Sequence, residues 1–431
     1  MSTGLIVFFV IFVLMFILKI RIPFGLSAAC LGYFLVSGQN LKIVAQQCTS
    51  SLYSSFAIIA VPLFIFSANV MNEGEITERV FGVAKGLVGR FYGGLAHVNV
   101  LASLIFSGMT GSAVADAAGL GKMEIEAMRK EGYDDGFSCA ITAASAVIGP
   151  IFPPSIPMVI YSMVSGASVG ALFMGGMVPG VLLAAFLMVY VALISRKRKY
   201  PRSKAPTTKE FFVYFFKALP AVMTPVILLV SIYTGVVTAT EAGALAGLYA
   251  VIIGAFGYKL IGWKKLYQCI LDTLATACTV GLCCGLASGI NFIMAKEKIA
   301  VSLANLAISI GTNKYTFLFV IDIIVLILGM FMDTNVIQLV FIPMIVPLAK
   351  NLGIDLVHLG VIMCYNMMIG LATPPYGGLL FITSAISGTP LKEVVKEIWI
   401  PVLVMIVLLF ILTYFPDIVL FLPRTLMGYG G

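Results

Sequence analysis

Long apolar runs separated by short polar segments make up most of the chain, and their lengths predict membrane-spanning helices. Runs of this kind lie at about 5–18, 22–37, 52–71, 171–194, 219–238, 240–261, 271–295 and 398–422. A helix of about 20 apolar residues crosses the hydrocarbon core of a bilayer. The pattern therefore predicts an all-α polytopic membrane protein.

Two other apolar stretches are interrupted near their centres by glycine and proline. GPIFPPS, from Gly149, breaks the stretch at about 136–165, and GLATPPYGG, from Gly370, breaks the one at about 356–388. Proline lacks a backbone donor, and glycine weakens a helix. Unwound backbone at membrane depth is tolerated only where it faces protein or a water-filled cavity. Each broken helix is therefore a candidate ion or substrate site, and a plain proline kink is the alternative interpretation.

Two further stretches, at about 93–128 and 315–349, are each too long for a single span. Each carries a polar, glycine-marked turn near its middle, at 107–112 in the first and 329–335 in the second. A helix that enters the membrane and turns back shows this pattern, because its turn must face protein or water. We expect two re-entrant helical hairpins.

The breaks and the hairpin turns recur at a constant shift. GYDDGFSCAITAASAVIGPIFPPS aligns with GIDLVHLGVIMCYNMMIGLATPPY at the shift that relates Ser112 to Asp333, which is 333 − 112 = 221 residues. A constant shift over this length predicts two structural repeats, and inverted repeats are a common plan of secondary transporters. We place the first repeat in 1–200 and the second in 201–431, each with scaffold helices, one hairpin and one broken helix.

Composition agrees with a membrane protein and directs attention to where the charges lie. With 60% hydrophobic and 11% charged residues, the chain has too little polar surface to cover a soluble domain. The net charge of +8 does not indicate a nucleic-acid partner, because most Lys and Arg residues lie between apolar runs. The densest basic cluster, 196–204, predicts a cytoplasmic linker between the repeats. A polybasic lipid-binding role is the alternative.

Asp333 is the sharpest candidate for a functional residue. It lies beside Thr334 and Asn335 inside an otherwise apolar hairpin, where a carboxylate is expensive to bury unless it is paired or solvated. A surface-loop aspartate is the alternative interpretation. Its repeat partner Ser112 also follows a glycine-marked turn, where the amides of a helix N-terminus bind carboxylates. Asp116 either caps a helix or joins the site.

The remaining polar residues give no sign of catalysis. Asp322 and Glu241 are interpreted as structural, His97 and His358 as packing or hydrogen-bonding residues, and the eight cysteines as packing residues. No Walker loop, GxGxxG motif or hydrolytic constellation is present. We therefore expect no enzyme, and an intramembrane enzyme or a membrane scaffold is the less favoured class.

Several segments together resemble the large membrane subunit of the tripartite ATP-independent periplasmic (TRAP) transporters over essentially the whole length. They are GGLAHVNVLASLIFSGMTGSAVADAAGLG, GPIFPPSIPMVIY, GVVTATEAGALAGLYA, GMFMDTNVIQLVFIPMIVPLAKNLGIDLVHLGVIM and IGLATPPYGGLLF. The resemblance implies an elevator-type transporter of the bacterial inner membrane that moves an organic acid together with Na⁺ through the lipid bilayer. It also implies two partners, a small four-helix membrane subunit (Q) and a soluble periplasmic substrate-binding protein (P).

The resemblance also implies where sodium and substrate bind. A first sodium site would comprise Ser103, Gly108, Thr110, Ser112, Gly149 and Pro150. A second would comprise Gly329, Asp333, Gly370, Thr373 and Tyr376. The substrate would lie between the hairpin tips, in contact with Ser112, Ser155, Asp333 and Asn335. The family usually has Ser-Gly-Ser at the first tip, where this chain has Thr-Gly-Ser at 110–112.

These observations lead to one functional expectation and one alternative to it. We expect sodium-coupled secondary active uptake of an organic acid that a periplasmic binding protein delivers. A site with hydroxyl groups, one carboxylate and no obvious arginine favours sialic acid, with a C4-dicarboxylate next. A stand-alone ion-coupled anion symporter of related architecture is the alternative.

Overall fold

The structure is a computed structural model, and it describes residues 2–18, 20, 22–54, 57–71, 75–203, 207–234, 236–298, 313–332, 334–375 and 377–430. Within these residues, six helices are long and apolar enough to cross a membrane. They are α10 (Val169–Arg198), α11 (Thr208–Tyr233), α12 (Ala239–Ile252) with its π-helical extension η1 (Ile253–Gly257), α13 (Trp263–Lys296), α15 (Lys314–Phe331) and α19 (Leu391–Tyr414). The predicted helical membrane architecture is confirmed.

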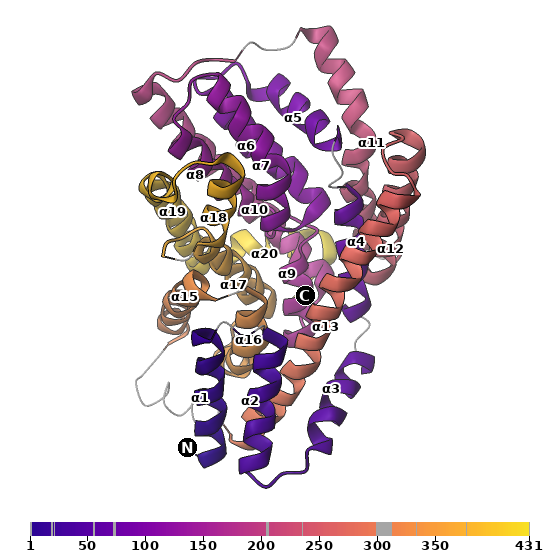
Figure 1. The fold of residues 1–431 in the computed structure, drawn as a ribbon, viewed down its shortest axis with the longest axis vertical. Helices are drawn as coiled ribbons and strands as arrows, with labels where there is room; N and C mark the ends of the chain where they lie inside the picture. Colours follow the sequence, from indigo (N-terminus) through magenta and orange to yellow (C-terminus); the bar gives the residue numbers. More distant parts are fainter. Residues whose placement is uncertain are drawn as a thin grey trace.

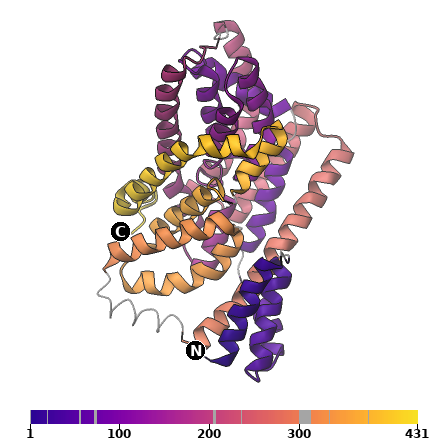
Figure 2. The same cartoon turned by 60° about the vertical axis from the view of Figure 1, so that its left-hand side comes forward.

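The chain begins with shorter helices. They are α1 (Thr3–Ile17), α2 (Ile22–Val36), α3 (Lys42–Ser54), α4 (Ala57–Met71) and α5 (Glu75–Val88). Helix α3 was missed by the sequence analysis because its composition, KIVAQQCTSSLYS, is largely polar. It packs against α13, and Figure 2 shows α1, α2 and α3 grouped beside the end of α13. Tertiary packing therefore stabilises a helix that hydropathy does not reveal.

Each repeat contains a helical hairpin. In the first, α6 (Gly94–Thr110) ends at Gly111, which has a left-handed φ of 60°, and α7 (Ala113–Lys130) begins with Ser112 as its N-cap. In the second, α15 is followed by α16 (Thr334–Asn351). Glycine adopts the left-handed conformation without steric penalty, so Gly111 allows the chain to reverse within two residues.

Each repeat also contains a helix that is broken where the sequence predicts it. The first consists of α8 (Asp135–Ala146) and α9 (Ile156–Ser165), and the second of α17 (Leu356–Leu371) and α18 (Gly378–Ser387). Equivalent hydrogen bonds follow both second halves. The Ser162 hydroxyl donates to the Ala167 carbonyl at 2.5 Å, and 222 positions later (384 − 162) the Ser384 hydroxyl donates to the Thr389 carbonyl at 2.7 Å. The turns that follow the two broken helices are thus hydrogen-bonded alike.

Two expected spans differ from the observed helices. The span expected at 219–238 begins earlier, because Thr207 and Glu210 form a capping box that starts α11 at Thr208. The single final span expected at 398–422 is wrong. Helix α19 ends at Tyr414, and α20 (Pro416–Met427) begins with proline in its first turn, a position that proline favours because its missing N–H would have no helical partner there.

The two repeats pack into one another. Helix α7 of the first hairpin packs against α18 of the second broken helix, and α16 of the second hairpin packs against α9 of the first broken helix (Figure 1). Long helices α10 and α19 follow the two broken helices and pack against each other. The crossed arrangement brings both hairpin tips and both breaks to the centre of the molecule.

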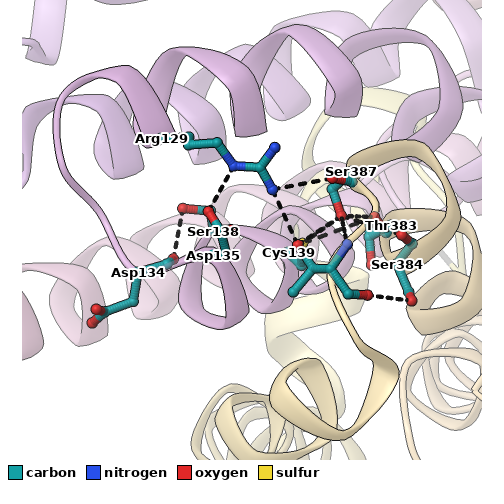
Figure 3. Close-up of polar contacts among 9 residues, drawn as sticks. Arg129, Asp134, Asp135, Ser138, Cys139, Thr383, Ser384 and Ser387 are labelled. Carbon is teal, nitrogen blue, oxygen red and sulfur yellow. Dashed lines mark hydrogen bonds and ion pairs between the residues drawn. The ribbon is translucent and has the colours of Figure 1, made fainter.

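A polar cluster joins the two repeats away from the tips (Figure 3). The Arg129 guanidinium donates to Asp135 at 2.7 Å, to the Ser387 carbonyl at 3.1 Å and to the Thr389 hydroxyl at 3.2 Å. The Cys139 sulfur lies 3.1 Å from the Ser387 hydroxyl. These contacts fix the start of α8 and the end of α7 against the turn after α18.

Candidate functional site

A cavity of about 190 Å³ lies where the two hairpin tips and the two breaks meet. The first repeat contributes Gly111, Ser112, Ala113, Val114, Pro150, Ile156 and Pro157, and the second contributes Thr334, Asn335, Met368 and Leu371. Helices α4 and α13 close it with Ile65, Thr276 and Val280. The sequence analysis did not single out these last three residues, because nothing in a local pattern shows which scaffold residue faces a distant tip.

The first hairpin tip rests against the first break. A Cβ atom at Gly111 would clash with the carbonyl oxygen of Pro154, so only glycine allows this approach. A Cβ atom at Gly149 would lie 3.4 Å from both the carbonyl carbon and the carbonyl oxygen of Ser112. The Ser112 hydroxyl accepts from the Ala115 amide at 3.4 Å and caps α7. The backbones of the tip and the break therefore lie close together.

The other residues of the first predicted sodium site lie around this contact. Ser103 is buried and its hydroxyl donates to the Ser145 hydroxyl at 3.1 Å. The Thr110 hydroxyl is buried without a hydrogen-bond partner in the part of the chain that the structure describes. Pro150 lines the cavity, and its carbonyl accepts from the Ser155 hydroxyl. Gly108 faces Pro225 of α11, which a Cβ atom would approach to 3.1 Å.

The second predicted sodium site centres on a contact between two glycines. A Cβ atom at Gly370 would lie 2.5 Å from the carbonyl carbon of Gly329, so α15 and α17 touch backbone to backbone. The Thr373 hydroxyl is buried and donates to the Ile369 carbonyl at 2.6 Å, which leaves its lone pairs available. Asp333 and Tyr376 lie outside the described residues.

The predicted substrate residues are placed differently from one another. Ser112 and Asn335 line the cavity from opposite tips. Ser155 is 1% exposed, and its hydroxyl already donates to the Pro150 carbonyl and accepts from the Met158 amide at 3.2 Å. It caps α9 and is not among the lining residues. In this arrangement Ser155 shapes the break, whereas Ser112 and Asn335 reach the cavity.

Buried polar side chains connect the first hairpin to the first broken helix. The Asn99 amide donates to the Thr142 hydroxyl at 2.6 Å, and the Ser145 hydroxyl donates to the Asn99 side-chain oxygen at 2.7 Å. With Ser103, these four residues form a network that is almost completely buried between α6 and α8. The sequence analysis found only Ser103, because hydroxyl and amide residues in an apolar helix are individually common.

The second repeat has a network with a carboxylate at the equivalent level. The Asp322 carboxylate accepts from the Asn366 amide at 3.1 Å and from the Thr413 hydroxyl at 2.7 Å. Asn366 stands 221 positions after Ser145 (366 − 145), so the repeat pattern offered a signal for it. The interpretation of Asp322 as structural agrees with these contacts, which tie α15 to α17 and α19.

Two carboxylates on α7 have no such partners. Asp116 and Glu124 are each 1% exposed, and neither accepts a hydrogen bond of normal geometry from the described residues, although the Ser103 hydroxyl lies near Asp116. Ser112 rather than Asp116 is the N-cap of α7. A buried carboxylate without a partner is costly as an anion, so these side chains are neutral or depend on a group that binds beside them.

The cavity combines features that suit a small anion and a monovalent cation. Residues of the first turns of α7, α9 and α16 line it, and the amides of a helix N-terminus carry partial positive charge. Carbonyl oxygens at the breaks are the groups with which discontinuous helices coordinate Na⁺. His97 and His358 play no part here. His97 makes an edge-to-face contact with Phe91, with ring centroids 5.8 Å apart, and His358 forms a hydrogen bond with the Leu412 carbonyl at 2.9 Å.

The hairpins, the breaks and the spans define the membrane permease of a secondary transporter. Comparison with known families agrees, since residues 5–418 match the family described as "Tripartite ATP-independent periplasmic transporter, DctM component". The chain belongs to this DctM family. It is a large permease component of a TRAP transporter in the bacterial inner membrane, and not an enzyme. Membership in a tripartite family implies a small membrane subunit and a periplasmic binding subunit.

Individual relatives carry different substrate names. The chain is 38% identical to the sialic acid TRAP transporter large permease protein SiaM of Vibrio cholerae, over 95% of this chain and 96% of that protein. It is 36% identical to the C4-dicarboxylate TRAP transporter large permease protein DctM of Pseudomonas aeruginosa, over 93% and 94%. The YdaH transporter of Alcanivorax borkumensis superimposes with a TM-score of 0.67 at 11% identity, covering 88% of this chain and 89% of that chain, and shows the fold alone.

Proposed function

We propose that this permease performs sodium-coupled secondary active uptake of an organic acid, with sialic acid favoured and a C4-dicarboxylate next. The observation that carries the proposal is the cavity of about 190 Å³ that both hairpin tips and both breaks line. Substrate and ions lie there at the interface between the repeats, where transporters of this architecture bind them.

Sodium binds at the two places where a hairpin meets a break. The first comprises the Ser112 carbonyl, which lies close to Gly149, and the Thr110 hydroxyl, which is buried without a hydrogen-bond partner among the described residues. At the second, the Gly329–Gly370 contact lies one turn from the Thr373 hydroxyl. Sodium prefers oxygen ligands of this kind, and each site joins a hairpin to a broken helix. Binding of the ion therefore stabilises the closed arrangement of that hairpin.

The lining of the cavity favours a monocarboxylate with hydroxyl groups. Ser112, Thr334 and Asn335 offer hydrogen bonds, and no Lys or Arg belongs to the described lining. A diacid would bring a second carboxylate to a site without a basic side chain, which is costly unless Na⁺ compensates. The cavity is smaller than the roughly 300–1,000 Å³ of pockets for larger ligands. Sialic acid therefore requires the tips to separate before it binds.

Transport follows an elevator motion in which the hairpins and broken helices carry the cavity across the membrane. Ile65 of α4 and Thr276 and Val280 of α13 close the cavity, and these two helices pack against each other outside the hairpins and broken helices. The small four-helix subunit holds the scaffold, and the periplasmic binding protein delivers the substrate. A stand-alone anion symporter of related architecture is the second candidate.

Uptake into proteoliposomes distinguishes these candidates. Vesicles that contain this chain and its small subunit are given radiolabelled sialic acid or succinate, with or without an inward sodium gradient and the binding protein. We expect uptake of sialic acid that requires both the gradient and the binding protein. Uptake that does not depend on the binding protein would support the stand-alone symporter, and uptake without a gradient would remove sodium coupling.

A further inference from the structure

A second pocket, of about 510 Å³, lies at the end of α10 and is separate from the transport cavity. The turn before α6 contributes Arg90, Phe91 and Tyr92, and α6 itself contributes His97. The other lining residues are Met188, Val189, Ala192 and Arg196 of α10 and Arg202 of the linker. No residue of this set belongs to the transport cavity. The proposed uptake mechanism therefore gives this pocket no role.

Backbone contacts fix the walls of this basic pocket. The Gly93 amide donates to the Pro201 carbonyl at 3.2 Å, and the Ser203 amide donates to the Gly89 carbonyl at 3.1 Å. A Cβ atom at Gly93 would clash with the Ser195 hydroxyl of α10, so the turn is held directly on the helix. The backbone of the turn and of the linker is therefore held in place beside α10.

Three guanidinium groups in the basic pocket have no acidic partner. Among the described residues, none of Arg90, Arg196 and Arg202 forms an ion pair, and Arg202 instead stacks on the Tyr92 ring at 3.8 Å from its centroid. Arg198, in the same turn of α10 as Arg196, pairs with both Asp134 at 3.1 Å and Glu397 at 2.7 Å. Carboxylates therefore neutralise the arginine next to the pocket, but no ion pair among the described residues neutralises the arginines inside it.

The other wall of the basic pocket is apolar and continues onto the outer face of α10. Met188, Val189 and Ala192 line it, and Val189 is 60% exposed. Leu193, on the same outer face, is 65% exposed. Helix α10 is long and apolar enough to cross a membrane, so an exposed apolar face on it suits contact with acyl chains. Phe91 and Tyr92 are half exposed, as is typical of aromatic residues at the membrane interface.

We infer that this pocket binds one anionic phospholipid of the cytoplasmic leaflet. The phosphate and headgroup lie among Arg90, Arg196 and Arg202, and an acyl chain lies along Val189 on α10. The arginines, which form no ion pair among the described residues, supply the complementary charge. The exposed apolar wall favours a ligand with an acyl chain over a purely soluble ligand. Basic pockets beside membrane helices on the cytoplasmic side bind anionic headgroups in this way.

Native mass spectrometry of the purified permease, together with its small subunit, tests the inference. Phosphatidylglycerol and phosphatidylcholine with identical acyl chains are titrated separately. We expect one saturable phosphatidylglycerol adduct whose dissociation constant rises about 30-fold in the variant Arg196→Gln/Arg202→Gln. The matched control Lys197→Gln/Lys199→Gln removes the same charge from the same chain segment and leaves the affinity unchanged. Arg202→Lys retains most of the binding.

Several outcomes would overturn the inference. Equal loss of phosphatidylglycerol in the Arg and Lys variants would indicate unspecific surface charge. No saturable adduct, or an adduct that the Arg variant retains, would show that the pocket is not a lipid site. Displacement by soluble glycerol 1-phosphate at similar concentration would identify a soluble phosphate as the ligand. An adduct of the isolated chain that disappears in the complex would show that the small subunit covers the pocket. Thermal unfolding of each variant checks that it is folded.

Discussion

The two repeats place glycine at equivalent positions but pack these glycines differently. In the second repeat, Gly370 meets Gly329, and a Cβ atom at Gly370 would lie 2.5 Å from backbone. In the first repeat, a Cβ atom at Gly149 would instead lie 3.4 Å from the Ser112 carbonyl, and a Cβ atom at Gly108 would lie 3.1 Å from Pro225 of α11. The backbones of the second hairpin and its broken helix therefore touch along the helices, whereas the first hairpin and its broken helix approach backbone to backbone at the tip and are joined along the helices by side chains.

The buried polar networks of the two repeats also differ from each other. The first repeat connects hairpin and broken helix through neutral groups, Asn99, Ser103, Thr142 and Ser145. The second uses a carboxylate, Asp322, with Asn366 and Thr413. The equivalent positions Ser145 and Asn366 thus lie in two different networks, the first without a carboxylate and the second with the Asp322 carboxylate. We expect substitutions at paired positions to have unequal effects.

The largest expected difference concerns the glycines. Gly370→Ala must push α17 away from α15, because the atoms it would meet are backbone, and overpacking of this kind costs about 1–3 kcal/mol. Gly149→Ala meets only contacts of 3.3–3.4 Å and should be milder. Sodium-driven uptake should fall roughly tenfold or more in Gly370→Ala. Equal loss of uptake in Gly149→Ala would show that the difference in glycine packing between the repeats does not affect transport.

The next effect concerns the stability of the networks. Asn366→Ala leaves a buried Asp322 oxygen without its amide donor and should lower the free energy of unfolding by about 1–3 kcal/mol. Ser145→Ala removes one hydroxyl from a neutral network and should cost about 1 kcal/mol. Thermal unfolding in detergent measures both. A larger loss of stability in Ser145→Ala than in Asn366→Ala would contradict the expectation that the network around the Asp322 carboxylate is the more sensitive of the two.

A smaller effect separates ion ligands from structural hydroxyls. Thr373→Val removes a hydroxyl that bonds Ile369, so both stability and sodium affinity should fall. Thr110→Val removes a buried hydroxyl without a partner, so stability should not fall while the sodium concentration for half-maximal uptake rises. Sodium titrations of uptake, paired with thermal unfolding, give both quantities. Unchanged sodium dependence in either variant would remove that threonine from its site.

The smallest expected effect compares two helix caps. Ser112→Ala and Ser168→Ala each remove an N-cap hydroxyl, of α7 and α10 respectively, and each should cost about 1 kcal/mol in stability. Only Ser112 lines the cavity, so only Ser112→Ala should raise the KM for the substrate. Uptake kinetics at saturating sodium provide the measurement. A similar rise in KM for Ser168→Ala would show that loss of the cap alone explains the effect.

The repeat, the hairpins and the breaks could be predicted from the sequence because each depends on local chemistry. Apolar length gives the spans, and Gly111, Pro153 and the counterpart of this proline, Pro374, mark places where a helix cannot continue. The cavity lining from α4 and α13 could not be predicted, since it depends on tertiary packing. The contact of Gly149 with Ser112, rather than with Gly108, could not be predicted from the sequence either. A shift of 221 residues predicts that the two halves are equivalent, not that they differ.

The most direct test of the account asks whether both hairpin tips enclose the bound substrate. Single variants Ser112→Cys and Asn335→Cys are made in a background in which the exposed Cys278 is replaced by serine. Their rates of maleimide labelling are measured with and without sodium and sialic acid. The account predicts that labelling at both positions slows together only when sodium and substrate are both present. Labelling that remains unchanged at both tips would contradict it.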